Sequence, residues 1–325
     1  MRILITGATG FVGTHLIDWL CEHGQHEIHG IARQGRWAAN YHPPANVVLH
    51  TLDLGNLNDL RQVLGAVQPE WIFHLAGYAN TGRSFREPDQ AWSGNWQGTF
   101  QLYQALASCN IRARVLYTST GLVYGSPTQG SHWCRESDPL FPASPYAASK
   151  AAADLLSYQV TCHPGLDVVR VRCFNQIGPR QAPDYATASF ARQVAMIEQG
   201  LKPPILETGD LSAQRDLTDV RDMVRSFTAL LEQAPAGEVY NAGSGQAQPM
   251  SAVVEKLVAL TPSVIQIKQL IDPQRQKDTS VSRSDIQKIR QATGWSPAYS
   301  LEESLHELLN FWRDQFSIAK MTVPA

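Results

Sequence analysis

The stretch MRILITGATGFVGTHL, residues 1–16, decides the fold. Residues Arg2–Thr6 form a short apolar run with β-branched members, which predicts a strand, and glycines then interrupt it. From Phe11 to His23 the apolar residues recur at helical spacing, so a helix follows the glycine turn. The chain therefore opens with a strand, a tight turn and a helix.

The same alternation continues along the chain. Further strands are predicted at Glu27–Ala32, Val47–Leu52, Trp71–Leu75, Arg114–Thr118 and Asp167–Arg172. Helical stretches are predicted at Leu57–Val67, Asp89–Cys109 and Ser144–Cys162. Strands that alternate with helices imply right-handed βαβ units, and hence an α/β fold with a doubly wound parallel sheet.

Three glycines in the first turn, Gly7, Gly10 and Gly13, have the spacing of a dinucleotide-binding turn. The first permits the turn, the second lets the backbone approach a pyrophosphate, and the third lets the helix pack closely on the strand. The helix N-terminus, with Phe11 and Val12, offers amide groups and a partial positive charge to the phosphates. Because the turn follows a strand and opens a helix, we interpret it as a Rossmann-type cofactor site.

The end of the second strand indicates which dinucleotide binds. Folds selective for NAD place an acid there for the ribose 2′-hydroxyl, whereas arginine accommodates a 2′-phosphate. Residues 29–36 read HGIARQGR, so Arg33, helped by Arg36, favours NADP; the alternative is a solvated surface arginine and a site that also accepts NAD. Asp53, followed by Leu54, is a candidate partner for the adenine amino group, unless it only begins the next helix.

The chain divides into a cofactor domain and a smaller, interleaved lobe. We assign residues 1–174 to the dinucleotide-binding domain. Residues 216–244 are assigned to the same domain, because Gly237–Gly245 again has the pattern of a strand that leads into a loop. Residues 175–215 and 245–325 make up the predicted substrate lobe, where prolines and glycines are frequent and helices are shorter. An amphipathic helix at Leu301–Phe316 closes the chain.

Composition excludes several classes of function. Lysine and arginine number 27 against 29 aspartates and glutamates, so a nucleic-acid binder, which needs a basic excess, is not expected. No apolar run reaches the length of a membrane span, and the N-terminus does not have the pattern of a secretory signal. The five cysteines are an odd number, widely spaced and without a C-x-x-C pair, which indicates reduced thiols, no metal site and a cytoplasmic protein.

A tyrosine and a lysine lie four residues apart in the predicted helix that begins near Ser144. Tyr146 and Lys150 therefore share one helix face. A phenol has a pKa near ~10, and a neighbouring ammonium is expected to lower the pKa of Tyr146 towards neutral and to hold the nicotinamide ribose. Thr120, after the fifth strand, lies near the same sheet edge and offers a hydroxyl to a substrate oxygen. These three residues are the candidate catalytic group.

Together these motifs resemble the extended short-chain dehydrogenase/reductases, which act on nucleotide-diphosphate sugars. The resemblance covers nearly the whole chain and rests on Thr6-Gly7-x-x-Gly10-x-x-Gly13, His74-Leu75-Ala76-Gly77, Asn95, Thr120 and Tyr146-x-x-x-Lys150. It implies that Leu75, Ala76, Gly77 and Asn95 also contact the cofactor. It further implies a homodimer in which each subunit contributes the helices predicted at Asp89–Cys109 and Ser144–Cys162.

Within this family the chain is most similar to the GDP-6-deoxy-D-mannose reductases, which reduce GDP-4-keto-6-deoxy-D-mannose to GDP-D-rhamnose. The similarity rests on Phe174-Asn175-x-Ile177-Gly178-Pro179, Gln214-Arg215-Asp216, Val239-Tyr240-Asn241 and Thr293-Gly294-Trp295. It implies an NADPH-dependent ketone reduction with Tyr146 as general acid. The candidate substrate residues are then Asn175 on the sugar side, Arg215 with Lys277 or Arg275 on the diphosphate, and Arg192. Each of these could instead be a surface or packing residue.

Two positions narrow the chemistry that the resemblance implies. The related dehydratases carry Asp-Glu after the catalytic threonine, and the related GDP-fucose synthases carry a cysteine base at the second of these positions; here the two residues are Gly121 and Leu122. Two reactions remain: reduction of a ketone, or the oxidation and re-reduction that a 4-epimerase carries out with NAD. A non-catalytic protein that senses the cofactor is a remote third alternative. The substrate loop departs from the family's Arg-Pro-Ser/Thr-Asp/Glu pattern, because Lys277 keeps a positive charge but lacks the bidentate fork of arginine.

Overall fold

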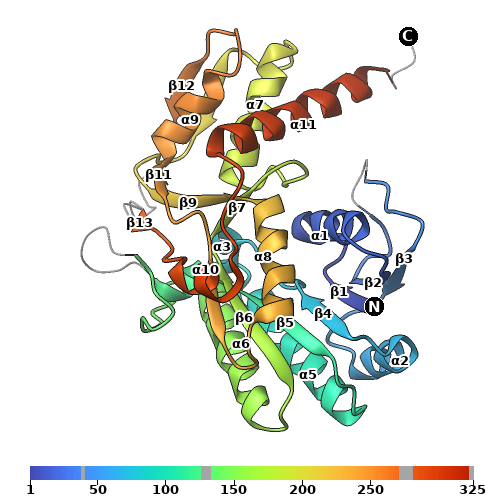
Figure 1. Ribbon diagram of the computed structural model, residues 1–325. Helices are drawn as coiled ribbons and strands as arrows, with labels where there is room; N and C mark the ends of the chain where they lie inside the picture. Colours follow the sequence, from blue (N-terminus) through green and yellow to red (C-terminus); the bar gives the residue numbers. More distant parts are fainter. Residues whose placement is uncertain (38–40, 126–132, 271–280, 322–325) are drawn as a thin grey trace.

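A seven-stranded, wholly parallel sheet forms the centre of the molecule (Figure 1). The computed structural model describes residues 1–37, 41–125, 133–270 and 281–321, with side chains to residue 317. Across the sheet the strands run in the order β10 (Val239–Ala242), β6 (Asp167–Cys173), β5 (Arg114–Thr120), β4 (Trp71–His74), β1 (Arg2–Thr6), β2 (Glu27–Ala32) and β3 (Val47–Thr51). The chain direction across the sheet therefore reverses between β1 and β4, and such a switch point is where open α/β sheets bind their ligands.

Helices cover both faces of this sheet. One face carries α1 (Phe11–Glu22) and α8 (Val220–Gln233), which pack side by side over a core that includes Leu16 and Phe227 (Figure 1). The other face carries α2 (Leu57–Val67), α5 (Gly98–Ser108) and α6 (Pro145–Cys162). The predicted α/β fold with a doubly wound parallel sheet is confirmed.

The helical stretch predicted near Asp89–Cys109 runs without a break from Pro88 to Ser108, but it contains a π-helical turn that the sequence did not indicate. The stretch consists of α4 (Pro88–Trp92), the π-helical turn η1 (Ser93–Gln97) and α5. The Thr99 hydroxyl donates to the Asn95 carbonyl at 2.6 Å, and a side chain on Gly94 would lie 3.2 Å from the Tyr78 nitrogen. The wide turn thus lets the helix pass close to the loop after β4 and brings Asn95 inwards, where it is buried. Hydrophobic periodicity cannot register a single π turn.

From residue 175 onwards the chain builds two small sheets and their own apolar core. One sheet contains β7 (Asn175–Ile177), β9 (Gln214–Asp219), β11 (Ala247–Pro249) and β13 (Val281–Ser282), and the other pairs β8 (Ile205–Thr208) with β12 (Gln266–Gln269). The core between them and α7 (Ala186–Glu198), α9 (Met250–Val258) and α11 (Leu301–Met321) includes Val194, Leu257 and Leu308. Short elements complete the chain at α3 (Thr81–Ser84), η2 (Gly121–Tyr124) and α10 (Gln287–Thr293).

None of the described helices is long and apolar enough to cross a lipid bilayer. Within the same residues, no group of three or more histidines, cysteines, aspartates and glutamates is arranged to hold a metal ion. All five cysteines are free.

A buried carboxylate joins the two parts of the chain. Asp216 on β9 is fully buried and accepts hydrogen bonds from the backbone nitrogens of Ser244 (2.7 Å), Gly245 (3.0 Å) and Ser284 (3.0 Å). The hydroxyls of Ser244 and Ser284 donate to it as well, at 2.6 and 2.5 Å. One side chain thus fixes the loop after β10 and the segment after β13 in a single arrangement.

We expect Asp216→Ala to lower the free energy of unfolding by about 3 kcal/mol or more, because several buried donors lose their acceptor together. Urea denaturation measures this loss. Asp314→Ala on the exposed face of α11 is the matched control and should change the stability by no more than about 0.5 kcal/mol. Equal effects of the two substitutions would contradict the role assigned to Asp216.

Candidate active site

The glycine turn after β1 lies directly against the end of β4. Gly7 has a φ of +72°, and a Cβ atom there would lie 2.9 Å from both the Cα and the nitrogen of Ala76. The Ala76 nitrogen also donates to the Thr6 hydroxyl at 3.1 Å, and the Leu75 nitrogen donates to the Thr6 carbonyl at 3.2 Å. Glycine is required at position 7 for both conformation and space.

A chain of buried hydrogen bonds continues from this contact. The Thr99 hydroxyl proton is used on the Asn95 carbonyl, so His74 donates from Nε2 to Thr99 Oγ1 (2.9 Å). Burial lowers the pKa of His74 to about 3, with a smaller contribution from the charge of Lys150, so the ring is neutral. Its Nδ1 therefore accepts from Thr6 Oγ1 at 2.7 Å. The chain rigidly joins β1, β4 and α5 beneath the cofactor turn.

Asn95 carries an acceptor that the described residues leave unpaired. Its amide nitrogen donates to Ser149 Oγ on α6 at 2.9 Å, but its Oδ1 is buried and has no hydrogen-bond partner. A Cβ atom on Gly77 would lie 2.4 Å from this oxygen. An unpaired buried acceptor beside a glycine-lined surface is the feature expected where a polar ligand completes the site.

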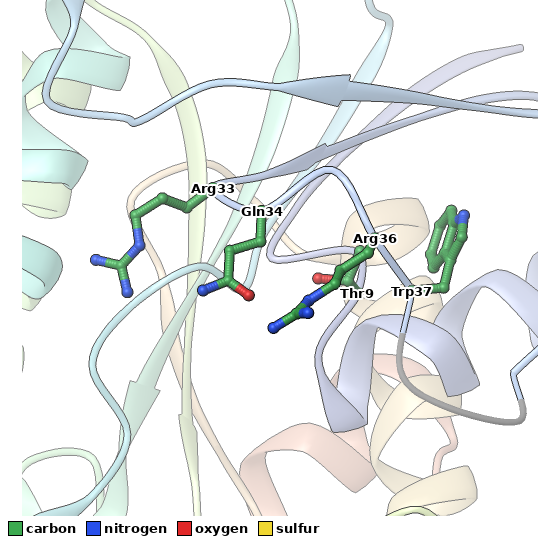
Figure 2. Close-up of a pocket in the computed structure, with 5 residues that line it drawn as sticks. All are labelled: Thr9, Arg33, Gln34, Arg36 and Trp37. Atoms are coloured by element: carbon green, nitrogen blue, oxygen red, sulfur yellow. The ribbon is translucent and has the colours of Figure 1, made fainter.

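The segment after β2 forms an open pocket of about 310 Å³ beside the glycine turn. Figure 2 shows Arg33, Gln34 and Arg36 projecting from this segment, with the guanidinium groups of the two arginines on either side of the Gln34 amide. Thr9 of the glycine turn and Trp37 complete the lining. Two cations and an amide beside a helix N-terminus provide the donors that a phosphate monoester needs.

Asp53 and Leu54 lie at the end of β3. The exposed Asp53 carboxylate accepts from the Gly55 nitrogen at 2.8 Å through Oδ1. The N-cap of α2 is Asn56, whose side chain accepts from the backbone nitrogens of Asn58 and Asp59, so Asp53 lies in the turn that leads into this helix. Leu54 is partly buried against the core and faces Gly98. A Cβ atom added to Gly98 would lie 3.4 Å from the Cβ atom of Leu54.

The candidate catalytic residues meet at the carboxyl end of β5. Thr120 is buried, caps η2 by accepting from the Leu122 nitrogen at 3.3 Å, and lies close enough to the Tyr146 side chain to lower the pKa of that phenol. Tyr146 is in the first turn of α6, which Pro145 and the N-cap Ser144 begin. The structure therefore brings a phenol and a hydroxyl together at the sheet edge, as the spacing predicted.

The expected effect of Lys150 on the phenol does not hold in this structure. Lys150 Nζ donates to the Thr118 carbonyl and lies 4.6 Å from the Tyr117 ring centre. Burial raises the pKa of Tyr146, and the neighbouring Thr120 hydroxyl opposes this rise only in part, while burial lowers the pKa of Lys150 to about 8. The spacing in the sequence predicts that Tyr146 and Lys150 share one helix face, but it does not reveal how burial changes their pKa values. Tyr146 is thus protonated near neutral pH, the state that a proton donor requires.

The first of the two positions that carry acids in dehydratases is filled here by a neighbouring aromatic ring. A Cβ atom on Gly121 would lie 2.9 Å from the ring of Phe174, which is itself buried against Val123, Tyr124 and Cys134. Leu122 supplies only an apolar side chain next to it. An acid at position 121 would have to displace a packed aromatic ring, so the fold as well as the sequence argues against a proton-abstracting pair.

The candidate substrate residues are not all brought together. Asn175 is exposed at the start of β7, and Arg215 on β9 pairs in register with Gln248 and Ser282. The guanidinium of Arg192 instead lies 5.8 Å from the ring centres of Trp312 and Phe316 on α11, where it contributes to packing within the lobe. Arg275 and Lys277 lie outside the described residues.

Several residues near this site were not singled out from the sequence. Thr9, Gln34 and Trp37 line the arginine pocket, and Ser149 holds Asn95. Only their positions next to predicted site residues could have indicated them, because serine, threonine and glutamine are common in loops and on helices. The role of Phe174 in filling the space beside Gly121 required the three-dimensional structure.

Comparison with known proteins shows the family to which the chain belongs. The family model described as GDP-mannose 4,6 dehydratase matches residues 4–308. The GDP-6-deoxy-D-mannose reductase of Pseudomonas aeruginosa is 33% identical over 97% of this chain and 98% of its own length. The UDP-glucose 4-epimerase of Mycolicibacterium smegmatis is 31% identical over 97% of this chain and 99% of its own.

A solved structure of RMD from Pseudomonas aeruginosa complexed with NADPH superimposes with a TM-score of 0.83 at 33% identity, and covers 96% of this chain and 99% of that one. The chain belongs to the GDP-mannose 4,6-dehydratase family of extended short-chain dehydrogenase/reductases. Members of this group include reductases, epimerases and dehydratases of nucleotide sugars. The resemblance inferred from the sequence is confirmed.

Proposed function

We propose that this protein is an NADPH-dependent reductase of the 4-keto group of a nucleotide-diphosphate 6-deoxy sugar, specifically GDP-4-keto-6-deoxy-D-mannose to GDP-D-rhamnose. The observation that carries the proposal is the protonated Tyr146 beside the Thr120 hydroxyl, next to a Gly121 that Phe174 closes to acids. This arrangement can donate a proton to an oxygen and lacks a pair to abstract carbon-bound hydrogen. The relative at 33% identity is named GDP-6-deoxy-D-mannose reductase.

The described residues fit an NADP cofactor. The glycine surface at Gly7 and Gly77 provides space, the unpaired Asn95 oxygen provides an acceptor, and the arginine pocket after β2 provides donors for a dinucleotide. The Asp53 carboxylate uses Oδ1 for the Gly55 nitrogen, so its Oδ2 would accept from the adenine amino group. NAD would fit the same turn, with the two arginines then facing a free ribose hydroxyl. When bound, NADPH supplies the hydride.

In the proposed mechanism the substrate's C4 oxygen accepts hydrogen bonds from the Tyr146 and Thr120 hydroxyls. As the carbonyl is reduced, Tyr146 donates its phenolic proton to that oxygen. Lys150, which bonds the Thr118 carbonyl, would hold the nicotinamide ribose beside it. Asn175 would contact the sugar, and Arg215 with Lys277 or Arg275 the diphosphate. A cytoplasmic location is part of the proposal and is supported by the five free cysteines.

Tyr146→Phe should lower kcat for reduction of GDP-4-keto-6-deoxy-D-mannose by about 10²–10⁴-fold, because the general acid is lost while the ring is kept. NADPH oxidation, followed spectrophotometrically, measures the rate, and fluorescence titration should show that NADPH still binds. Tyr299→Phe, on a part-exposed tyrosine outside the site, is the control and should retain full activity. Full turnover by Tyr146→Phe would refute the proposed acid.

The same assay separates the proposal from a nucleotide-sugar 4-epimerase, the activity named for the relative at 31% identity. An epimerase re-reduces its own intermediate, so it would be purified with tightly held NAD and would need no added reductant. Net oxidation of NADPH by the ketosugar is the outcome that we expect instead.

We assign the preference for NADPH to Arg33 and Arg36. Replacing both by alanine removes two cations from the phosphate pocket and should weaken NADPH binding by about 10-fold to 100-fold, equivalent to about 1.4 kcal/mol for each factor of ten. NADH binding should change little, because NADH lacks the 2′-phosphate. Isothermal titration of both nucleotides tests this, and a parallel loss of affinity for both would contradict the assignment.

We further propose a homodimer formed through α4, η1 and α6. Trp92, Trp96, Leu155 and Tyr158 are each between 38% and 59% exposed, and α4 and η1 both pack against α6. Leu155 and Tyr158 are three residues apart on one helix, as Trp92 and Trp96 are four apart. A cluster of large exposed apolar side chains on adjoining helices is the kind of surface that pairs with its own copy.

Light scattering after size exclusion should give wild-type protein twice the 35.9 kDa mass of one chain. Leu155→Glu should yield the monomer, since a charge would be buried in the apolar interface. Val264→Glu, at a residue that is 92% exposed beside β12, should remain dimeric. A wild-type monomer would overturn this proposal without affecting the proposed chemistry.

A further inference from the structure

A buried ionic group lies on the same face of α6 as the catalytic residues. Tyr146, Lys150 and Asp154 follow one another at intervals of four residues. The Asp154 side chain is fully buried and accepts from Arg170 Nη1 at 2.7 Å and from Arg172 Nε at 3.0 Å, both on β6. The arginines hold the pKa of Asp154 below its usual value despite its burial.

Arg172 also reaches the element that follows Thr120. Its Nη1 donates to the Tyr124 hydroxyl at 2.9 Å, and its guanidinium carbon lies 5.1 Å from the centre of that ring. Tyr124 is the last residue of η2, the short helix that Thr120 caps. One guanidinium therefore bridges the helix of Tyr146 and the turn of Thr120.

The far side of Tyr124 is fixed as well. Its hydroxyl donates to Asn241 Oδ1 on β10 at 2.7 Å, and Asn241 Nδ2 donates to the Cys134 carbonyl at 2.8 Å. Arg172, Tyr124 and Asn241 are 4%, 5% and 0% exposed, so water does not compete for these hydrogen bonds. In a buried network every donor and acceptor restricts the others to one geometry.

We propose that Arg172, through Asp154 and Tyr124, is a positioning residue that holds the Thr120 turn at the distance from α6 at which the Thr120 and Tyr146 hydroxyls can bind one oxygen. The expected effect on the reaction rate rests on the proposed function. The expected position of the Thr120 turn relative to α6 does not depend on the substrate. Thr120 ends β5 and Tyr146 is in α6, so the distance between their hydroxyls depends on what holds those two elements together. A displacement of about 1 Å far from the reacting atoms can cost about 10²-fold in rate.

Tyr124→Phe tests this inference better than a change at Arg172. Replacing Arg172 would leave Asp154 underpaired inside the protein and is expected to unfold it. Tyr124→Phe keeps the packed ring and removes only the hydroxyl between Arg172 and Asn241. Tyr103→Phe is the matched control, because the Tyr103 hydroxyl is also buried and bonds α6 through Ser157 Oγ at 2.7 Å, seven residues beyond Lys150.

Two readouts separate positioning from stability. In cofactor-free protein labelled with [¹³C]tyrosine, the Tyr146 ring resonance, identified from its absence in Tyr146→Phe, should shift in Tyr124→Phe and stay in place in Tyr103→Phe. With NADPH and GDP-4-keto-6-deoxy-D-mannose, Tyr124→Phe should lower kcat by about 10-fold to 100-fold with little change in KM, while Tyr103→Phe keeps the wild-type kcat. Both variants should lose a similar amount of thermal stability.

The positioning role is wrong if Tyr124→Phe and Tyr103→Phe have the same effect on the Tyr146 resonance and the same effect on kcat, whether that effect is zero or not. If wild-type protein reduces no 4-keto sugar, the proposed function fails, and the resonance comparison still decides the positioning inference.

Discussion

The close contact between the end of β1 and the end of β4 is the constraint on which the site depends. At this point the strand order reverses, and only a glycine at position 7 allows the two backbones to approach. The neutral His74, hydrogen-bonded to Thr6 and Thr99, fixes that contact from below and joins it to the π turn that carries Asn95. The cofactor surface is therefore preformed by buried hydrogen bonds within the fold.

Sequence reasoning was most reliable where a local pattern determines the structure. The helix at Leu57–Val67 and the strands at Arg2–Thr6 and Glu27–Ala32 were predicted to the residue, because apolar periodicity and flanking turns define them. The meeting of Thr120 and Tyr146 also followed, since strand ends and helix starts of a parallel sheet share one edge.

Features that depend on packing between distant segments were beyond the sequence. The π turn at Ser93–Gln97 exists because Gly94 and Asn95 fit against the loop after β4. The raised pKa of Tyr146 comes from burial, which spacing along a helix does not reveal. Arg192, one of several arginines that could have faced a diphosphate, packs on aromatic rings of α11 because an amphipathic helix from the far end of the chain covers α7.

The central claim is that a protonated phenol at the sheet edge completes a reduction at one carbon and does nothing else there. Identification of the product by NMR after incubation with GDP-4-keto-6-deoxy-D-mannose, with NADPH consumption recorded in parallel, tests it most directly. The account predicts a GDP-6-deoxyhexose carrying a new hydroxyl at C4, with one NADPH oxidised for each product molecule. Exchange of C4 configuration in a nucleotide sugar without net NADPH oxidation would contradict it.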